Sequence, residues 1–572
     1  MRLQENLIVM NKRMADQLLC CMQDDVGEIR LIAADILINY APECLHEYCL
    51  DRMSAFSSLL LSSVKQQKAE LGALFCSCIV HFHLKNKNTT AALELLNNIL
   101  KQLDDSSRDL QCNLLKTARQ NSPFGKLRAL SLMISETRKI KDFYKSTASC
   151  KIVEAISEIA LKFIKFFLDS LFSCKNSNDY VASADFEEIT TRINKLVLDD
   201  QNSENNQTLL TDDHEVVLAC GWLSLRDGAA LYAEAESLLS EITRRSDDHV
   251  RRVCKNFYHV LCFCRHRGAI ESTYDSMVRY LCALPVSCFT APLQLLDEAI
   301  ATLESTKVGS KPVAGATITR RSAGNPLLIK AVLTADVKKH NSMKETHDYV
   351  DRLTRVATSD QDESCADETA DLPQVDALYA IKSLLFDSFL GPKLDAAHVL
   401  ESALTTSLWC LKSDVWVVRN AATHLLGAVS ARMLGQKHTE DGVGGGSFLT
   451  AGEFFTRFPL ALTLAQSVLS GEEDDPRVFP LLSILCRLKR SAGIYTGVEK
   501  GNELGFVKEK MLGLLTSKSY SIRVIASKCC LSLNSAEKCL NICSYFFSVV
   551  HDNGLFFSLK KYYNLELIFI KS

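Results

Sequence analysis

The sequence predicts an all-α fold, specifically a HEAT/armadillo-like helical-repeat solenoid. Only 11 of the 572 residues are proline and 24 are glycine, the residues that most often interrupt regular structure. Apolar residues recur at three- and four-residue spacing almost from end to end, which is the period of an amphipathic helix. A chain of this length is too long for one compact core, so a stack of helical repeats fits both observations.

A short pattern of an apolar residue, an arginine and an alanine supports the repeat architecture. It occurs at Ile29–Ala33, Val418–Ala422 and Ile522–Ala526, each inside an apolar helical stretch. In HEAT and armadillo repeats the small alanine lets helices approach, and the arginine reaches a carboxylate or carbonyl in a neighbouring turn. At about 40 residues per repeat, the chain has room for about a dozen.

Three regions are expected along the chain: 1–145, 146–445 and 446–572. The first forms HEAT-like repeats, the second a helical-repeat core with basic stretches, and the third further HEAT-like repeats with an atypical tail. An acidic loop is expected near 357–373, where six acidic residues occur without a basic one. The apolar run Ile156–Phe172 contains four charged residues, so we expect a buried helix there and no membrane insertion.

Charge and cysteine content narrow the class of protein further. The net charge of −3 excludes a uniformly basic nucleic-acid coat, although local patches remain possible. The 22 cysteines are scattered, often within apolar helical runs, and the first residues lack the apolar segment of a secretory signal. A reducing compartment is therefore expected, and we predict a cytoplasmic protein.

Two stretches are strongly basic, 244–267 and 307–340. The first holds seven Lys or Arg against two Asp, and the second holds seven against one Asp. In the first stretch, apolar residues at helical spacing predict that three cationic residues project from the opposite helix face: Arg251, Arg252 and Lys255. Two such stretches indicate a surface for a polyanion, since Lys and Arg contact phosphates without reading sequence. Ordinary solvated helix faces explain the first stretch equally well.

The second basic stretch contains a distinctive segment, RRSAGNP. Its residues are Arg320, Arg321, Ser322, Ala323, Gly324, Asn325 and Pro326. Two guanidinium groups precede a turn of small residues that leaves backbone groups accessible. The segment resembles the R-R-S-A-G-L-P signature of the THADA (thyroid adenoma-associated) family, with Asn325 in place of leucine.

Four other segments resemble this family in the same order along the chain. Trp222–Asp227 is similar to W-R-S-x-K-E, and Arg265–Glu271 to R-H-R-G-A-x-E. Val415–Ala422 is similar to V-W-x-V-R-N-x-x, and Glu453–Pro459 to E-F-F-x-R-F-P. Because family members are usually far longer than this chain, a fragment is expected.

The resemblance implies a non-catalytic regulatory or scaffold subunit. Fungal members of the family are partners of an FtsJ-like tRNA ribose methyltransferase, so this chain is expected to position the tRNA anticodon arm for 2′-O-methylation of nucleotide 32. Under this interpretation Arg320 and Arg321 contact phosphate or the enzyme, and Ser322–Gly324 provide a backbone of close approach. A second contact or supporting cluster is expected at Arg265, His266 and Arg267. The alternative is a general HEAT-repeat adaptor for protein partners.

Enzymatic interpretations find little support in the sequence. The glycine run Gly442–Gly446 follows charged residues, no strand precedes it and no Lys-Ser or Lys-Thr follows, so a linker is expected. Nothing alternates strand with helix as a Rossmann-like methyltransferase requires. Within a continuous helix, 100° steps would spread four possible ligands around the axis: Cys76, Cys78, His81 and His83. We therefore expect no cofactor, no metal and no catalytic residue.

Overall fold

The computed structural model describes residues 10–140, 143–172, 212–243, 245–264, 266–305, 324–359, 372–435, 449–489 and 503–534. Within these ranges the regular structure is helical, and the sole strand-like pairing is an isolated bridge between Thr450 and Lys489. The predicted all-α helical-repeat fold is confirmed. The described residues form two compact units that divide between Asp297 and Glu298, with Lys338–His340 clustering with the first unit. The predicted regions 1–145, 146–445 and 446–572 stay predictions.

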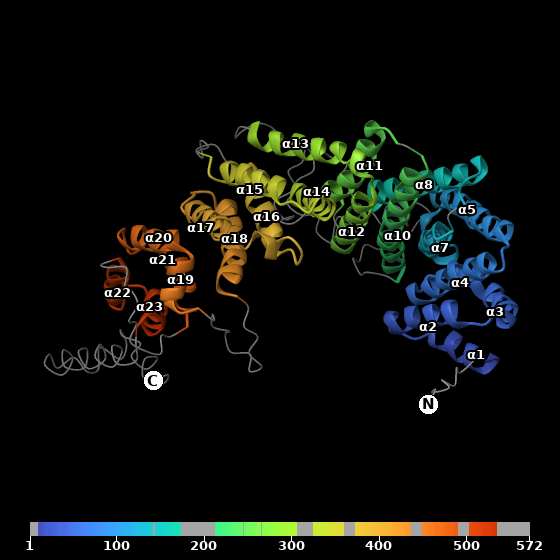
Figure 1. The fold of residues 1–572 in the computed structure, drawn as a ribbon, viewed down its shortest axis with the longest axis horizontal. Helices are drawn as coiled ribbons and strands as arrows, with labels where there is room; N and C mark the ends of the chain where they lie inside the picture. The colour runs from blue at the N-terminus through green and yellow to red at the C-terminus, as the bar shows by residue number, and fades with distance from the viewer. Residues whose placement is uncertain are drawn as a thin grey trace, which may run out of the picture. The chain divides into compact units, whose positions relative to one another are not determined.

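The first unit contains the helices up to the start of α13 (Figure 1). Their bounds are α1 Lys12–Cys21, α2 Gly27–Tyr40, α3 Glu43–Leu61, α4 Gln66–Lys85, α5 Thr89–Cys112, α6 Leu114–Gln120, α7 Phe124–Arg138, α8 Thr147–Phe167, the π-turn η1 Leu168–Phe172, α10 Asp212–Ile242, α11 Asp247–Phe263, α12 Arg267–Ala283, the 3₁₀ turn η2 Val286–Cys288 and α13 Thr290–Ser305. The apolar run that begins at Ile156 forms most of α8 and η1, and its Ile156, Phe163 and Phe167 side chains are buried, as predicted.

Helix α10 is the longest helix of the described chain, with 31 residues, and it packs against α6, α7, α8 and α12. Small residues make its close packing possible. A Cβ at Gly228 of α10 would lie 3.3 Å from the Ile164 side chain of α8. Two other glycines face the end of α3, because a Cβ at either Gly72 or Gly125 would collide with the backbone of Leu61. Glycines at these three positions therefore allow close packing of α10 on α8, and of α4 and α7 on the end of α3.

The second unit contains the helices from α14 onward together with the end of α13. Their bounds are α14 Asn325–His340, α15 Lys344–Ala357, α16 Pro373–Phe386, the 3₁₀ turn η4 Gly391–Leu394, α17 Ala397–Cys410, α18 Trp416–Leu434, α19 Ala451–Arg457, α20 Pro459–Leu469, α21 Val478–Leu485, α22 Glu503–Leu514 and α23 Tyr520–Leu533. Arg432 of α18 donates to the carbonyl oxygens of Leu385 and Asp387, which fastens α18 to the end of α16. Most of the predicted acidic loop, 360–371, lies outside the described residues, as does the glycine run Gly442–Gly446.

The repeated arginine pattern has the same structural role at all three places. In each case Nη1 donates to the carbonyl oxygens of the residues six and five positions earlier. The distances are 2.9 and 3.1 Å for Arg30, 2.8 and 2.7 Å for Arg419, and 2.7 and 3.1 Å for Arg523. The guanidinium thus satisfies carbonyls in the turn before the helix, where the backbone has no helical partner. The predicted contact with a carbonyl is confirmed, and it recurs in both units.

Candidate functional site

The RRSAGNP segment leads directly into α14. Gly324 is the N-cap residue, and its φ of 66° is a left-handed value that favours glycine. Pro326 occupies the first turn, where a missing N–H has no cost. Asn325 Nδ2 donates a 2.9 Å hydrogen bond to Asp376 Oδ2 in the first turn of α16. The departure from the family's leucine therefore provides a polar tie between α14 and α16. Four predicted contact residues lie outside the described residues: Arg320, Arg321, Ser322 and Ala323.

The structure brings two of the segments of family resemblance together at the start of α12. His266 is the N-cap residue, and its Nδ1 accepts a 3.2 Å hydrogen bond from the backbone N–H of Ala269. The imidazole stacks on the Trp222 ring of α10, with ring centroids 5.1 Å apart and planes inclined by 14°. A Cβ at Gly268 would lie 3.3 Å from the His266 ring and 3.9 Å from Trp222, so the small residue makes room for this stack. Burial lowers the pKa of His266, which favours the neutral ring that can accept in a cap.

The predicted cationic residues of α11 and α12 differ in exposure. Arg252 and Lys255 are exposed and Arg251 is half-buried, while the apolar residues of the opposite face are buried: Val250, Val253, Cys254, Phe257 and Leu261. The predicted outward orientation is confirmed for Arg252 and Lys255, whereas Arg251 lies at the edge of the buried face. The Arg267 side chain is 91% exposed and forms a 2.8 Å ion pair with Glu271 one turn later. Arg265 lies outside the described residues.

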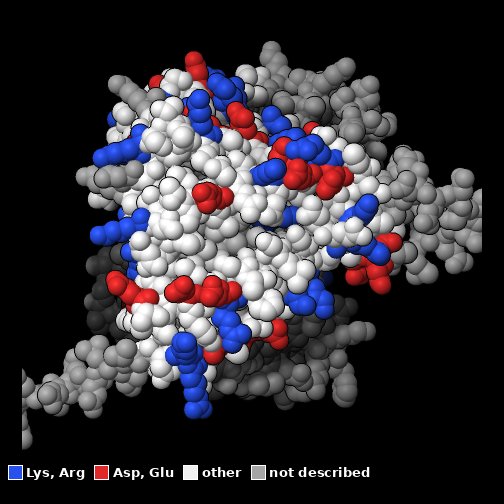
Figure 2. Space-filling model, turned by 90° about the vertical axis from the view of Figure 1, so that its right-hand side faces the viewer, with Lys and Arg blue, Asp and Glu red and all other residues white. Residues whose placement is uncertain are grey.

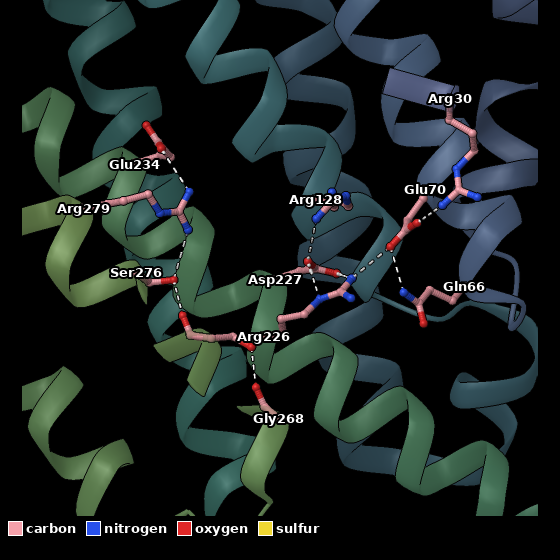
Figure 3. A network of polar contacts seen from close by, with 11 residues as sticks. Arg30, Gln66, Glu70, Arg128, Arg226, Asp227, Glu234, Gly268, Ser276 and Arg279 are labelled. Carbon is pink, nitrogen blue, oxygen red and sulfur yellow. Dashed lines mark hydrogen bonds and ion pairs between the residues drawn. The ribbon is translucent and has the colours of Figure 1, made fainter. Parts of the chain in front are cut away.

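A network of arginines and carboxylates connects four helices around Arg226, one turn after Trp222 (Figure 3). The Arg226 guanidinium lies 5.5 Å from the Trp222 ring centroid and donates to Asp227 at 2.9 and 3.0 Å. It also reaches Glu70 of α4 at 3.4 Å. Glu70 in turn accepts from Arg30 of α2 at 2.6 Å, and Asp227 lies 3.4 Å from Arg128 of α7. Three guanidinium groups therefore share two carboxylates.

The two carboxylates of this network have pKa values that shift in opposite directions. Burial favours a raised pKa for both groups. For Glu70, which is partly exposed, a hydrogen bond from Gln66 and the charges of Arg128, Arg226 and Arg30 outweigh burial and lower the pKa. For Asp227, burial outweighs the attraction of Arg226 and Arg128, and the pKa is raised. The network therefore ties the helices together. At Asp227, its most buried carboxylate, the arginines offset only part of the effect of burial on the pKa.

A second set of polar contacts, also drawn in Figure 3, joins α12 to α10. Arg279 of α12 lies 3.6 Å from Glu234 of α10 and donates to Ser276 at 3.2 Å. Together with the Trp222 stack, these contacts hold α12 against α10. The arrangement positions helices, and the arginines at its centre are engaged by carboxylates.

Sequence reasoning identified only part of this network. Arg226 and Asp227 fall in a segment of family resemblance, and Arg30 falls in the repeat pattern. No sequence pattern pointed to Glu70 or Arg128. Glu70 is 40 residues from Arg30 and 156 residues from Arg226 along the chain, so no local spacing relates them. Only the packing of α2, α4, α7 and α10 brings these side chains within hydrogen-bond distance.

The cysteines and one histidine of α4 pack against or contact the rest of the protein. Cys76 and Cys78 are buried, and burial raises the pKa of the Cys76 thiol to about 12. His81 forms a 3.0 Å contact with Glu136 of α7. Across the described ranges, no group of three or more His, Cys, Asp or Glu side chains is arranged to hold a metal ion.

Surface charge and hydropathy give two further observations. On the face shown in Figure 2, lysines and arginines alternate with acidic residues around a broad uncharged area, so the described residues of this face form no continuous basic surface.

Within the described part of the chain, no single helix is long and apolar enough to cross a membrane. The pair Arg267–Ala283 and Val286–Ser305, bent by 118°, meets that criterion only in combination.

Two consecutive parts of the chain match models of one protein family. Residues 149–417 match the model described as THADA/TRM732, DUF2428, and residues 419–553 match the model described as Trm732, C-terminal TPR repeats. The two models together cover more than half of the sequence. The chain belongs to the THADA/Trm732 family.

Similar proteins are named as tRNA (32-2′-O)-methyltransferase regulators. The mouse protein of this name, THADA, is 31% identical over 326 residues, which cover 54% of this chain and 16% of the mouse protein. The trm732 protein of Schizosaccharomyces pombe is 25% identical over 350 residues, covering 58% of this chain and 22% of that protein. THADA of Drosophila melanogaster is 21% identical over 495 residues, which cover 80% of this chain and 27% of that protein. The chain thus spans less than a third of the length of each of these relatives.

Proposed function

We propose that this chain is a non-catalytic regulatory part of a tRNA 2′-O-methyltransferase assembly that acts on nucleotide 32 of the anticodon loop. The observation that carries the proposal is the match of 149–417 to the THADA/TRM732 model, together with relatives named as regulators of this methyltransferase. Under this proposal an FtsJ-like enzyme in the cytoplasm supplies the methyl-transfer chemistry. The helical repeats bind that enzyme and the tRNA anticodon arm, and hold the loop for reaction.

The proposal assigns roles to the residues of the two basic stretches. Arg320 and Arg321 contact phosphate or the enzyme, and Ser322 to Gly324 allow close approach of the backbone. Asn325 and Pro326 anchor this segment at the start of α14, as supported by the hydrogen bond from Asn325 to Asp376. Further contacts with tRNA or the enzyme are assigned to Arg265, Arg267, Arg251, Arg252 and Lys255. His266, which stacks on Trp222, supports the start of α12 beside them.

The test is methylation in a reconstituted system. The chain is co-expressed with the FtsJ-like methyltransferase of the same organism, and 2′-O-methylation of nucleotide 32 is measured on tRNA with and without the chain. We expect methylation to depend on the chain and to fall at least ten-fold for Arg320→Ala with Arg321→Ala. A matched control, Lys101→Ala with Lys116→Ala, removes two exposed lysines of α5 and α6 and should leave methylation unchanged. An active enzyme that methylates equally well without the folded chain rejects the proposal.

A general protein adaptor is the second candidate, because α2 carries an exposed apolar face. Ile29, Ile32, Ile36 and Tyr40 follow one another at helical spacing, and their exposure reaches 71% at Tyr40. Such a face is typical of a surface that a protein partner covers. Salt-sensitive binding of tRNA by the isolated chain favours the regulator, whereas protein binding without tRNA binding favours the adaptor.

A further inference from the structure

The outward face of α11 combines cationic and aromatic side chains. Arg252, Lys255, His259 and Phe263 follow at intervals of three or four residues, so they lie on one side of the helix. The first three are exposed and Phe263 is half-buried. Within the described ranges, neither Arg252 nor Lys255 forms an ion pair, in contrast to Arg267 on the next helix. As far as the described residues are concerned, both cations are therefore available to a ligand.

His259 and Phe263 form an aromatic pair at the surface. Their ring centroids are 4.4 Å apart and the planes are inclined by 37°. Burial against the protein, with a contribution from the charge of Lys165, lowers the pKa of His259, while the charge of Asp169 opposes that shift. The imidazole is therefore largely neutral at physiological pH, and it presents an uncharged ring beside the cations of its own helix.

A second helix adds a positive charge to this face. Lys165, near the end of α8, is exposed and close enough to His259 for the two to interact electrostatically. The carboxylate of Asp169 in η1 also acts on His259, with the opposite sign. The face therefore combines the aromatic pair with Arg252 and Lys255 of α11 and Lys165 of α8, while Asp169 is a carboxylate that acts on His259.

We propose that this surface, made by Arg252, Lys255, His259, Phe263 and Lys165, binds a single-stranded segment of RNA. The inference rests on the proposed function, because it names a surface through which the chain would bind the tRNA. The cations contact successive phosphates, and an unpaired base stacks on the aromatic pair. Paired bases within an RNA helix cannot reach an aromatic side chain, so the combination of rings and cations fits a loop and not a duplex.

The test is RNA binding by the full chain, measured by fluorescence anisotropy between about 50 and 200 mM KCl. The probes are a labelled RNA stem-loop with an unpaired loop and a fully paired RNA duplex with the same stem. Arg252→Gln with Lys255→Gln should lower the slope of log affinity against log salt concentration by about 1.4 for the stem-loop, because two phosphate contacts are lost. The matched control Lys101→Gln with Lys116→Gln should leave that slope unchanged.

The aromatic part of the surface is tested separately. We expect His259→Ala to weaken stem-loop binding about ten-fold, as loss of one stacked base predicts, without changing the salt slope or duplex binding. His259→Phe keeps an aromatic ring and should restore the affinity. Circular dichroism of each variant confirms that the helices remain folded.

Two results would overturn the inference. If the stem-loop binds normally to both the charge variant and His259→Ala, the RNA contact lies elsewhere, and methylation in the reconstituted system can still depend on the chain. If the charge variant weakens the stem-loop and the duplex equally and His259→Ala has no effect, the surface attracts any polyanion and has no preference for unpaired bases. Failure of the proposed function is recognised independently, by chain-independent methylation of nucleotide 32.

Discussion

The arginines of the first unit occupy two contrasting environments. Around Arg226, the guanidinium groups of Arg30, Arg128 and Arg226 share Glu70 and Asp227, and each carboxylate lies between helices. On the outward face of α11, Arg252 and Lys255 have no such partners within the described residues. The same residue types therefore connect helices in one place and face solvent in the other.

This difference shows that the charge of a local sequence segment does not by itself predict whether its cations are exposed for binding. A basic stretch predicts a polyanion surface only when its charges remain uncompensated, and compensation depends on carboxylates far away in the chain. The interior set should control stability, because removing one partner leaves a buried charge unpaired. The outward set should control binding and leave stability almost unchanged.

The largest expected effect is that of Glu70→Ala. This change removes the carboxylate that Arg30, Arg226 and Gln66 share, and the side chains of Glu70 and Arg30 are only 12% and 8% exposed. We expect a loss of about 3 kcal/mol in the stability of the first unit, because two arginines lose a partner inside the protein. Differential scanning calorimetry should show its transition lower by about 6–12 °C. An unchanged transition would mean that the network carries little of the packing energy.

A smaller loss is expected for Gly125→Ala, which tests packing without charge. The new methyl group would lie 2.9 Å from the Ala69 Cβ and closer still to the Leu61 carbonyl oxygen, so α7 would have to move away from α3. We expect about 2 kcal/mol of destabilisation, measured from the same transition. Gly427→Ala in α18 is the matched control, since a Cβ there meets nothing within 4 Å, and it should stabilise its helix by about 0.5–1 kcal/mol. Destabilisation by both changes would point to the helix backbone and not to the α3 contact.

The fold followed from the sequence because helix periodicity and the scarcity of proline and glycine are local signals. The contact of Arg30, Arg419 and Arg523 with preceding carbonyls could also be predicted, because donor and acceptors lie within six residues of each other. Similarly, Glu453 of the E-F-F segment closes a capping box with Thr450 at the start of α19, an arrangement set by spacing alone.

The candidate site was less accessible to sequence reasoning, because its contacts are not local. The stack of His266 on Trp222 joins segments 44 residues apart, and its details depend on how α12 packs against α10. Asn325 is another example: in the sequence it only replaces a leucine, whereas in the structure it donates to Asp376, 51 residues later. A resemblance to a family identified which segments to inspect, and only the structure showed what each side chain contacts.

The burial of Asp376, which accepts the hydrogen bond from Asn325, predicts a dependence of stability on pH, and the hydrogen bond itself opposes the shift in pKa. Burial raises the pKa of Asp376 to about 6, so the folded state binds its proton more tightly than the unfolded chain does. Stability from this group is fully present below the unfolded pKa and is lost as the pH rises through about 6. Asp376→Asn keeps the acceptor oxygen without the ionisation, so its melting temperature should exceed that of the wild type by a few degrees at pH 8 and by much less at pH 5. Asp348→Asn, at an exposed position of α15, should give no pH-dependent difference.

The smallest expected effect completes the comparison between interior and outward charges. Arg252→Gln with Lys255→Gln should change the stability of the first unit by less than about 0.5 kcal/mol, because both side chains are exposed and form no ion pair with the described residues. The calorimetric transition used for Glu70→Ala measures this directly, on the same protein sample used for RNA binding. A weaker salt dependence of RNA binding with an unchanged transition separates the two sets of cations by function. A transition lowered as much as in Glu70→Ala would instead place Arg252 and Lys255 with the arginines that hold the helices together, and the distinction between the two regions would fail.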